Sequence, residues 1–320
     1  MNHVPVSLKE VDRVEIVTLI DNYVDVLLKD TDVVTRPQID KGGEIHTDSF
    51  LAEHGLSILI TVSKGEKTHT FLLDTGYTKV GVLHNMAQLG IAVRTIEAIV
   101  ISHAHMDHTG SLFALLEEIP GSVPLIVHPD AFLSPRYIEQ NDGKRQKFPR
   151  TLIREDLTRK GVNILESKGP VLIADDFAAV TGEVERTTEF EKGLPGALIE
   201  RREKIERDPV RDDQSVVVKL KDKGLVVISG CSHAGIINTI LYAQRITGLT
   251  KVHAILGGFH LSGPSFGSII EKTIQEIKMI EPKVLLPMHC TGWDAVKRFS
   301  EEFPASFILN SVGSKITLSG

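Results

Sequence analysis

The sequence predicts an α/β (α+β) fold in which β-sheets form the core and helices cover them. Short apolar runs of the kind that form buried strands recur along the 320 residues. Segments with helical periodicity separate these runs, and in residues 267–280 the isoleucines follow a period close to 3.6. Several of the apolar runs also end in histidine. Strands that alternate with helices favour sheets with helical covers.

The first half of the chain is expected to supply strands for one part of the core. Apolar runs predict strands at 14–20, 56–62, 68–73, 96–101 and 124–128. The second and third of these are joined across residues 63–66, which is a hairpin signal. Helices are predicted at 79–89, where Gly90 supplies a stop, and from 111 to about 118.

The last third is the most regular part of the chain. Strands are predicted at 215–220, 224–229, 253–256, 283–287, 307–309 and 315–318. Helices are predicted at 234–246, 267–280 and 294–302. The first two strands form a hairpin around residues 221–224.

We expect a single domain over residues 1–320, interrupted by insertions near 25–50, 134–161 and 185–213. The first is irregular, and the second is basic and expected to be exposed. The third is highly charged, with a predicted helix at 197–207. Such a charged segment is either a solvated face or a lid over a site. Short β-like runs fill residues 162–184.

Composition excludes several classes of protein. The hydrophobic share of 42% and the charged share of 24% are those of soluble globular proteins. The net charge of -6 argues against broad nucleic-acid binding. Two cysteines imply no disulfide framework, and neither a signal peptide nor a membrane-spanning run is recognised. We therefore expect a cytoplasmic protein without a membrane partner, and a homo-oligomer is left open.

The most informative stretch is the loop His103-Ala104-His105-Met106-Asp107-His108, which follows the predicted strand at 96–101. Neutral imidazoles and a carboxylate are ligands for zinc, iron or manganese. His103 and His105 can converge on one ion. Asp107 and His108 are neighbours in sequence and cannot easily join the same tetrahedron, so they suggest a second ion beside the first.

Three later strand ends also carry histidine, namely His233, His260 and His289. The carboxyl ends of strands in such sheets are where sites gather. We expect His233 and His289 to be metal ligands, and His260 to be either a ligand or a catalytic or substrate-binding residue. In contrast, His84 and His128 are interpreted as structural or surface residues.

Three other residues near these strand ends have two interpretations each, and two helices also begin there. Asp74 either orients a metal-bound histidine or forms an ordinary turn. Cys231 and Cys290 are either thiolate ligands or, as we favour, small buried neighbours. The helix beginning near Ala234 is expected to favour an anionic substrate group at its N-terminus, and so is the helix beginning near Gly267.

These motifs resemble the metallo-β-lactamase superfamily. The strand-end sequences around His233, His260 and His289 are similar to one branch, which contains dihydropterin-phosphate synthase-like proteins and metal-dependent hydrolases. The resemblance spans residues 14–318. It implies a four-layer αββα sandwich with the metals at one edge of the two sheets.

The resemblance also implies the ligand sets. The first metal would be held by His103, His105 and His233, and the second by Asp107, His108 and His289. Most members of the superfamily have a bridging Asp between the last two histidines, but this sequence has no Asp between His233 and His289. Either His260 or Cys231 takes that place, or the bridge is missing. Another alignment puts Cys231 at the bridge and Asp212 or Asp213 near the third-ligand position.

The expected function is hydrolysis of a phosphorylated small molecule that is a phosphoester, pterin-like or nucleotide-like. One or two divalent ions, zinc first with manganese or iron as alternatives, would lower the pKa of a water to about 7. Asp107 and His260 are the expected catalytic residues. The alternatives are a pterin-related synthase (transferase), a redox di-iron protein, and a non-catalytic metal or ligand sensor.

Overall fold

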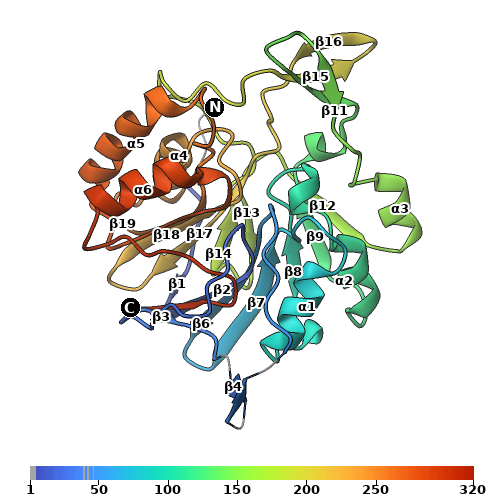
Figure 1. The fold of residues 1–320 in the computed structure, drawn as a ribbon. Coiled ribbons are helices and arrows are strands. Elements are labelled where there is room, and N and C mark those ends of the chain that lie inside the picture. Colours follow the sequence, from blue (N-terminus) through green and yellow to red (C-terminus); the bar gives the residue numbers. More distant parts are fainter. Residues whose placement is uncertain (1–4, 39, 42, 46) are drawn as a thin grey trace.

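Two large β-sheets pack face to face between two layers of helices (Figure 1). The computed structural model describes residues 5–38, 40, 41, 43–45 and 47–320. Residues 1–4, and positions 39, 42 and 46 of the 25–50 insertion, lie outside the described residues. The predicted α/β class and αββα sandwich are both confirmed.

The first sheet is built from the N-terminal half of the chain together with the C-terminal strand. Its order is β12 (Asn163–Glu166), β9 (Pro124–Val127), β8 (Ala98–Val100), β7 (Lys67–Leu73), β6 (Ser57–Lys64), β2 (Arg13–Ile20), β21 (Lys315–Ser319) and β3 (Val34–Thr35). The predicted hairpin of β6 and β7 is present. Strands β7, β8 and β9 run parallel, so their carboxyl ends lie at one edge.

The second sheet is built from the last half of the chain. Its order is β13 (Val171–Ile173), β14 (Ala178–Val180), β17 (Ser215–Leu220), β18 (Gly224–Ser229), β19 (Val252–Gly258) and β20 (Val284–Met288), with β1 (Glu10–Val11) beside β17. Strands β18, β19 and β20 run parallel. The predicted strand at 307–309 forms only an isolated bridge between Phe307 and Leu285.

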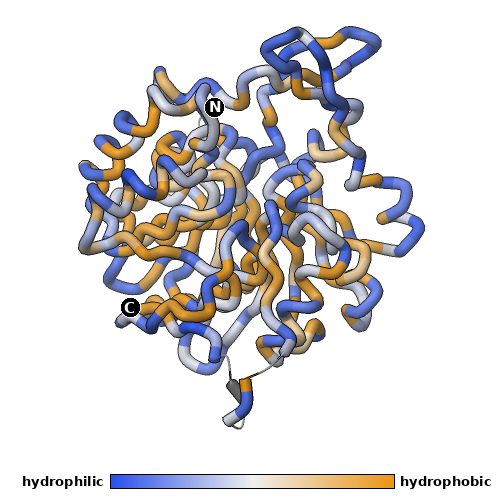
Figure 2. Tube along the Cα trace, in the orientation of Figure 1, coloured by the Kyte–Doolittle hydropathy of each residue, from blue (hydrophilic) through white to orange (hydrophobic). Residues whose placement is uncertain are grey.

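The main hydrophobic core lies between the two sheets, where Ile58 and Phe71 of the first pack with Val216, Ile228 and Leu256 of the second. These side chains alternate along their strands with residues that face the helices, which is the period-two pattern of a sheet. Figure 2 shows the hydrophobic segments concentrated in the strands and the hydrophilic ones at the periphery.

The helices bury apolar stripes against the outer faces of the sheets. On the first sheet lie α1 (Gly81–Gln88), α2 (Leu112–Glu118) and α3 (Arg154–Arg159). On the second lie α4 (Ile236–Thr247), α5 (Gly267–Ile280) and α6 (Trp293–Glu302). The four short helical turns are η1 (Val93–Thr95), η2 (Met106–His108), η3 (Pro129–Phe132) and η4 (His289–Thr291). None of the described helices combines the length and hydrophobicity needed to cross a membrane.

Two of the predicted insertions pair with each other. Residues 134–161 and 185–213 together form a small antiparallel sheet ordered β11 (Arg145–Lys147), β10 (Arg136–Glu139), β15 (Ala197–Arg201) and β16 (Lys204–Arg207), at the upper right of Figure 1. In the first insertion, β4 (Asp40–Lys41) and β5 (Glu44–Ile45) form a separate two-stranded sheet.

The helix predicted at 197–207 is therefore wrong. Its residues form a hairpin in which β15 pairs with β10, so that Ala197 and Ile199 are buried. The turn places Arg202 and Glu203 at φ values of 48° and 64°. Positive φ at both central residues suits a tight hairpin, but such turns normally signal themselves by Asn-Gly or Asp-Gly. Pairing with a distant strand overrides the helical propensity of the Glu, Arg and Lys side chains.

Candidate metal centre

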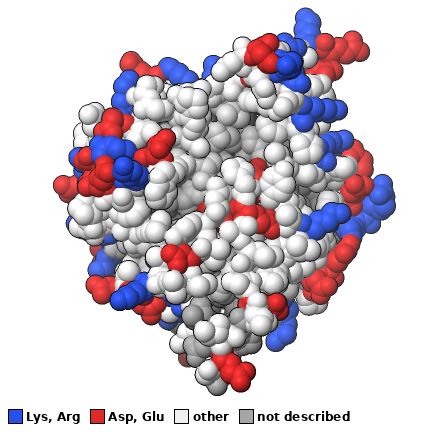
Figure 3. Space-filling view, viewed as in Figure 1, with Lys and Arg blue, Asp and Glu red and all other residues white. Residues whose placement is uncertain are grey.

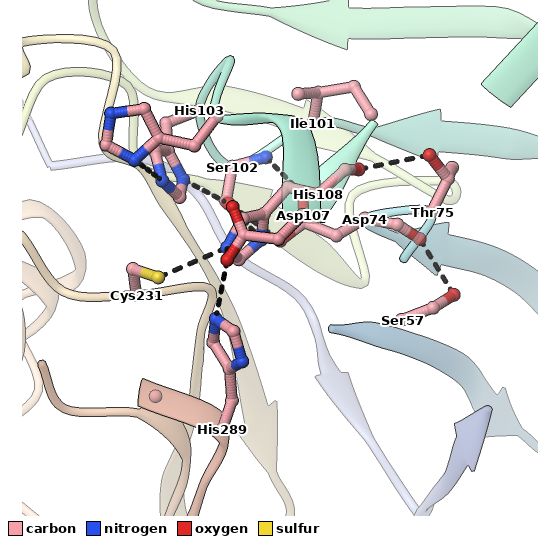
Figure 4. A network of polar contacts seen from close by, with 12 residues as sticks. Ser57, Asp74, Thr75, Ile101, Ser102, His103, Asp107, His108, Cys231 and His289 are labelled. Carbon is pink, nitrogen blue, oxygen red and sulfur yellow. Dashed lines mark hydrogen bonds and ion pairs between the residues drawn. The ribbon is translucent and has the colours of Figure 1, made fainter. Parts of the chain in front are cut away.

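The carboxyl ends of five strands meet at one edge of the sandwich. They supply Asp74 after β7, Ser102 to His108 after β8, Cys231 and His233 after β18, His260 after β19, and His289 after β20. Figure 4 shows that residues of both sheets face each other across this edge. The parallel order of β7 with β8, and of β18 with β19 and β20, is what brings these distant residues together.

Three of the predicted ligands form a first group of nitrogen donors. His103 Nε2 lies 3.0 Å from His105 Nδ1 and 3.1 Å from His233 Nε2. Two imidazoles on one tetrahedral zinc, each with Zn–N near 2.0–2.1 Å, have their nitrogens roughly 3.3 Å apart. All three residues are buried, and the group has the spacing and chemistry to hold a metal ion.

The other three predicted ligands form a second group. Asp107 Oδ2 lies 3.6 Å from His108 Nε2 and 3.4 Å from His289 Nε2. These residues are also buried, and they too can hold an ion. The structure thus gathers all six predicted ligands into the two sets that the resemblance implies.

Hydrogen bonds to the outer ring nitrogens orient three of these histidines. His108 Nδ1 donates to Asp74 Oδ2 at 2.7 Å, and His289 Nδ1 faces Asn22 Oδ1 at 3.2 Å. His103 Nδ1 lies 3.0 Å from the Ser102 hydroxyl, which itself donates to Asp74 Oδ2. In the neutral ring, this leaves each Nε2 with a lone pair aimed into the centre, as a metal requires.

Asp74 is buried and forms hydrogen bonds with the loop of residues 102–108, which carries four of the proposed ligands. Its Oδ1 accepts the Ser102 N–H at 2.7 Å, and the residue adopts a left-handed φ of 61°. Of the two interpretations of Asp74, this arrangement agrees with the one in which it orients a histidine. A glycine on the facing strand makes the approach of the sheets possible, because a Cβ at Gly230 would lie 2.2 Å from Ser102 Oγ.

Burial and neighbouring charges shift the pKa values in the metal-free centre. Burial, followed by the neighbouring histidines, holds the pKa of His103 and of His233 well below the usual range, and burial lowers that of His105 to about 4. For His108, burial would lower the pKa, but the carboxylates of Asp74 and Asp107 outweigh it and raise the pKa to about 9. The first group is therefore neutral, which is the state that coordinates a metal.

Asp107 is held in its charged form. Burial would raise its pKa, but His108 and His289 outweigh burial and keep the pKa of Asp107 well below its usual range. An ionised carboxylate is the state required of a hard ligand in the second group. Near the opening of the centre, the exposed His54 places Nε2 at 3.8 Å from Asp107 Oδ2.

The two cysteines differ in their surroundings. Cys290 fits the favoured interpretation, since its thiol is buried and donates to the backbone carbonyl of Cys231 at 3.5 Å. Cys231 does not fit it, because its Sγ lies 3.1 Å from His108 Nε2. Cys231 therefore lies among the proposed metal donors, and Cys290 shares a metal-capable set with Cys231 and His289.

His260 lies beside the first group rather than inside it. Its ring centroid is 4.2 Å from that of His233 and 5.1 Å from that of Phe266. It forms a third set of close donors with Cys231 and His233, and it also lines a cavity. Both predicted roles, ligand and catalytic or substrate-binding residue, are compatible with this position.

Asp212 and Asp213 take no place among the donor groups of the described residues. Asp212 accepts a bidentate ion pair from Arg136, at 2.6 and 3.1 Å, and the Ala104 N–H at 2.9 Å. Asp213 accepts the Ala234 N–H at 2.8 Å. Their carboxylates hold the loops that carry the ligands, so the alignment that made either one a ligand is not supported.

Arg136 is the buried cation of this network, and its loss has a predictable cost. Arg136→Met should lower the free energy of unfolding by about 3–5 kcal/mol, because it leaves the buried carboxylates of Asp208 and Asp212 without their partner. Urea unfolding of the metal-free protein measures this. Arg145→Met removes an exposed pair with Glu139 and should cost less than about 1 kcal/mol. Equal losses in the two variants would contradict the assignment.

A cavity of about 240 Å³ opens beside His233 and His260. Its other walls are Phe190 to Gly193 and Pro195 of the third insertion, Ser232, Gly235, Phe259 and Leu261, and the start of α5 from Ser265 to Ile269. Figure 3 shows the face hollowed near its centre, with most charged side chains toward the rim. The highly charged segment 185–213 thus contributes a wall of this cavity as well as exposed residues in β16.

Glu191 occupies the N-terminus of α4. Its carboxylate accepts the N–H groups of Ile237 and Asn238, each at 2.8 Å. The expectation that this helix end is open to a substrate anion is therefore wrong, because a side chain of the chain itself fills it. The N-terminus of α5 has no side-chain cap and also lies at the cavity.

Burial raises the pKa of Glu191 to about 7, although the backbone N–H groups of Asn238 and Ile237 act to lower it. A folded-state pKa above the unfolded value stabilises the protein below about pH 4.5, and this stabilisation is lost as the pH rises through 7. The difference in unfolding free energy between the native chain and Glu191→Gln should fall by about 3 kcal/mol over that range. Chemical unfolding at several pH values tests this, with exposed Glu189→Gln as control. A flat or rising difference would refute it.

Sequence reasoning missed several residues of the site. Asp21 accepts the His289 backbone N–H at 2.8 Å, and Asn22 contacts the ring of the same residue. Both directly follow β2, so the strand-end rule that found the histidines could also have found them. His54 and Arg136 stand in irregular or inserted segments and carried no such signal.

The comparisons with known proteins agree with this geometry. A family described as the metallo-beta-lactamase superfamily matches residues 52–198. The 7,8-dihydropterin-6-methyl-4-(beta-D-ribofuranosyl)-aminobenzene-5'-phosphate synthase of Methanocaldococcus jannaschii is 31% identical over 303 residues, covering 94% of this chain and 95% of that one. An uncharacterised protein of the same organism is 31% identical over 83% of this chain and 94% of its own length.

One solved structure is similar over its whole length. It is a crystal structure of a metal-dependent hydrolase of the beta-lactamase superfamily, with a TM-score of 0.70 and 25% identity, and the match covers 96% of this chain and 100% of that one. The relatives thus include both a synthase and a hydrolase, on a shared fold.

Proposed function

The chain belongs to the metallo-beta-lactamase superfamily, and from this membership we propose that it is a metal-dependent hydrolase of a phosphate-containing small molecule. The observation that carries the proposal is the pair of donor groups, in which side chains from both sheets meet beside one cavity. The substrate class is a phosphoester with a pterin-like or nucleotide-like body. A cytoplasmic location and the absence of a nucleic-acid partner stay predictions from composition.

The donors fit zinc best, because imidazole nitrogens and a single carboxylate at tetrahedral spacing are its usual ligands. Manganese or iron would suit the same nitrogen and oxygen donors. When bound, one or two divalent cations would polarise a phosphoryl oxygen and bring the pKa of a water to about 7.

The residues of the chain would perform the other tasks. Asp107 stays ionised near the opening of the centre, where its carboxylate can orient a nucleophile. His260 lies on the cavity wall, from which its imidazole can donate a proton to the leaving group or contact the developing anion. Asp74 fixes His108 in one orientation throughout.

The cavity favours a flat ring system that carries an anion. Phe190 and Phe266 line the cavity, and aromatic rings stack on planar groups. The uncapped N-terminus of α5 supplies backbone N–H groups that suit a phosphate. Both features lie within the same cavity as His260.

A second candidate is a synthase that transfers a pterin-like group to an amine. The named relative of Methanocaldococcus jannaschii, which matches this chain over 94% of its length, favours it. In such a reaction the amine of an aminobenzene substrate would attack the carbon of the pterin-like group that carries a phosphate ester. The carbon–oxygen bond would break, the phosphate would leave toward the same donor groups, and the amine would give up a proton. The site residues are common to both candidates, so product analysis has to separate them.

The test compares two assays of the zinc-loaded protein. One follows the release of nitrophenolate from bis-nitrophenyl phosphate, and the other follows the joining of a dihydropterin precursor to 4-(β-D-ribofuranosyl)aminobenzene 5'-phosphate by mass. Hydrolysis that disappears in Asp107→Ala supports the leading proposal, whereas a condensed product that also depends on Asp107 supports the synthase. Full activity of Asp107→Ala in both assays would exclude either metal-dependent reaction.

Two further alternatives have readouts of their own. A redox di-iron protein would show visible absorption after purification. A non-catalytic sensor would bind a ligand tightly without turnover, and its affinity would not change in Asp107→Ala. Either result would replace the proposed activity.

A further inference from the structure

The sulfur of Cys231 lies between the two donor groups (Figure 4). Its Sγ is within 4.8 Å of donor atoms in His103 and His233 of the first group. It is also within 4.8 Å of donor atoms in His108 and His289 of the second group. Among the described residues outside the two groups, Cys231 alone shares metal-capable sets with members of both groups.

A centre that holds two cations here needs more negative charge than one carboxylate supplies. Asp107 is the one carboxylate in the metal-capable sets of the described residues, and the remaining members are imidazoles and thiols. Two buried divalent cations with a single anionic ligand would leave most of their charge uncompensated, which is costly away from water. An anionic ligand between the cations would reduce that cost for both.

The contacts of the second group point to the same position. His289 Nε2 is buried, with Asp107 Oδ2 at 3.4 Å as its ion-pair contact, and it shares a metal-capable set with Cys231. The Cys231 Sγ to His108 Nε2 distance of 3.1 Å is close to the spacing of two ligands on one ion. Two imidazole nitrogens of the second group therefore lie around the sulfur.

The neighbouring strand, β19, places no side chain at the position between the two donor groups that Cys231 occupies. Strand β19 passes between β18 and β20 and carries glycine at 257 and 258 beside the centre. A Cβ at Gly258 would lie 2.5 Å from the Gly230 carbonyl and 2.7 Å from Cys290 Sγ, so no larger residue fits there. The strand end of β18, rather than that of β19, supplies the side chain that faces both groups.

We propose that the Cys231 thiolate is a ligand shared by two cations, one in each donor group. This inference rests on the proposed function only in requiring that the chain bind metal. On binding, the Cys231 thiol gives up its proton to solvent, and its sulfur forms one bond to each cation. Cys290, whose thiol is turned to the Cys231 carbonyl, takes no part.

X-ray absorption at the zinc edge of the fully loaded protein tests the proposal directly. A shared thiolate gives an average of one sulfur per zinc near 2.3 Å, beside nitrogen and oxygen near 2.0–2.1 Å. The spectrum should also show a zinc–zinc distance of about 3.5–4 Å. An average of half a sulfur per zinc would mean that the thiolate binds one cation only. An average of zero would mean that it binds neither cation. Either value overturns the proposal.

Two matched variants show which cysteine supplies the zinc-bound sulfur. Cys231→Ser should remove the shell near 2.3 Å, and Cys290→Ser should keep it at one sulfur per zinc. Loss of the shell in Cys290→Ser instead would overturn the assignment. The spectrum of the native chain needs no variant, so the proposal stays testable even if Cys231→Ser folds poorly.

Metal content, measured on the same samples, separates the two proposals. Two zinc ions per chain without a sulfur shell would leave the proposed function standing and remove the shared thiolate. A chain that takes up no zinc would remove both.

Discussion

His103→Ala should lower the turnover of the zinc-loaded protein by on the order of 10³-fold or more. His103 Nε2 lies at the centre of the first group, within 3.1 Å of both other nitrogens, so its loss leaves two ligands where three are needed. A bound cation contributes several kcal/mol of transition-state stabilisation, and each loss of about 1.4 kcal/mol of that stabilisation lowers the rate tenfold. The release of nitrophenolate from bis-nitrophenyl phosphate measures the change.

The matched control is another histidine. His84→Ala removes a ring that contacts only the Ser49 carbonyl among the hydrogen bonds of the described residues and belongs to none of their metal-capable sets. It should keep zinc content and turnover within about twofold of the native chain, since surface substitutions rarely matter. Equal losses in the two variants would show that His103 acts through general stability and not as a ligand.

Asp74→Asn should weaken zinc binding by about 10–100-fold, the usual effect of removing a group that orients a ligand. The carboxylate accepts from His108 Nδ1 and from both the N–H and hydroxyl of Ser102, so the amide would lose the charge and one acceptor. Asparagine tolerates the left-handed φ of 61°, so the backbone should not change. Competition with a chromogenic chelator measures the affinity.

Asp74→Asn also changes the pH dependence of the metal-free chain. The raised pKa of His108 stabilises the folded state fully below about pH 6.5, and this contribution is lost as the pH rises through 9. Removing the Asp74 charge should flatten this fall in unfolding free energy. Asp222→Asn is the control, because it has a left-handed φ of 56° in an exposed turn. Native-like zinc affinity in Asp74→Asn would contradict its role.

The gathering of the proposed ligands at one edge was predictable because they follow strands that the sequence identifies. Apolar runs locate the ends of β8, β18 and β20, and parallel packing then brings His103, His233 and His289 to one edge. The ligand loop needs no long-range information for His103 and His105, which are two residues apart. Local pattern and fold rules placed these side chains at one edge, and the resemblance supplied their division into two sets.

Other parts depend on contacts between distant segments that no local pattern encodes. Arg136 and Asp212 are 76 positions apart, and the helix predicted at 197–207 became a hairpin because β15 pairs with β10. Glu191 fills the end of α4 from 46 positions away. In each case the partner, rather than the segment itself, determines the conformation.

The different surroundings of the two cysteine thiols could not be predicted from the sequence either. Both follow parallel strands and both are buried beside a proposed ligand, so sequence gave one interpretation for the pair. The structure separates them, because one thiol meets a backbone carbonyl and the other meets His108 Nε2. That difference arises from how the ends of β18, β19 and β20 stack.

The most direct test of the account is the metal content of the chain purified without chelator. We expect one or two divalent cations per chain, bound most tightly when the cation is zinc, and a clear loss of metal in His103→Ala but not in His84→Ala. A metal-free chain that takes up neither zinc, manganese nor iron on reconstitution would contradict the convergence of these histidines on cations, and with it the proposed chemistry.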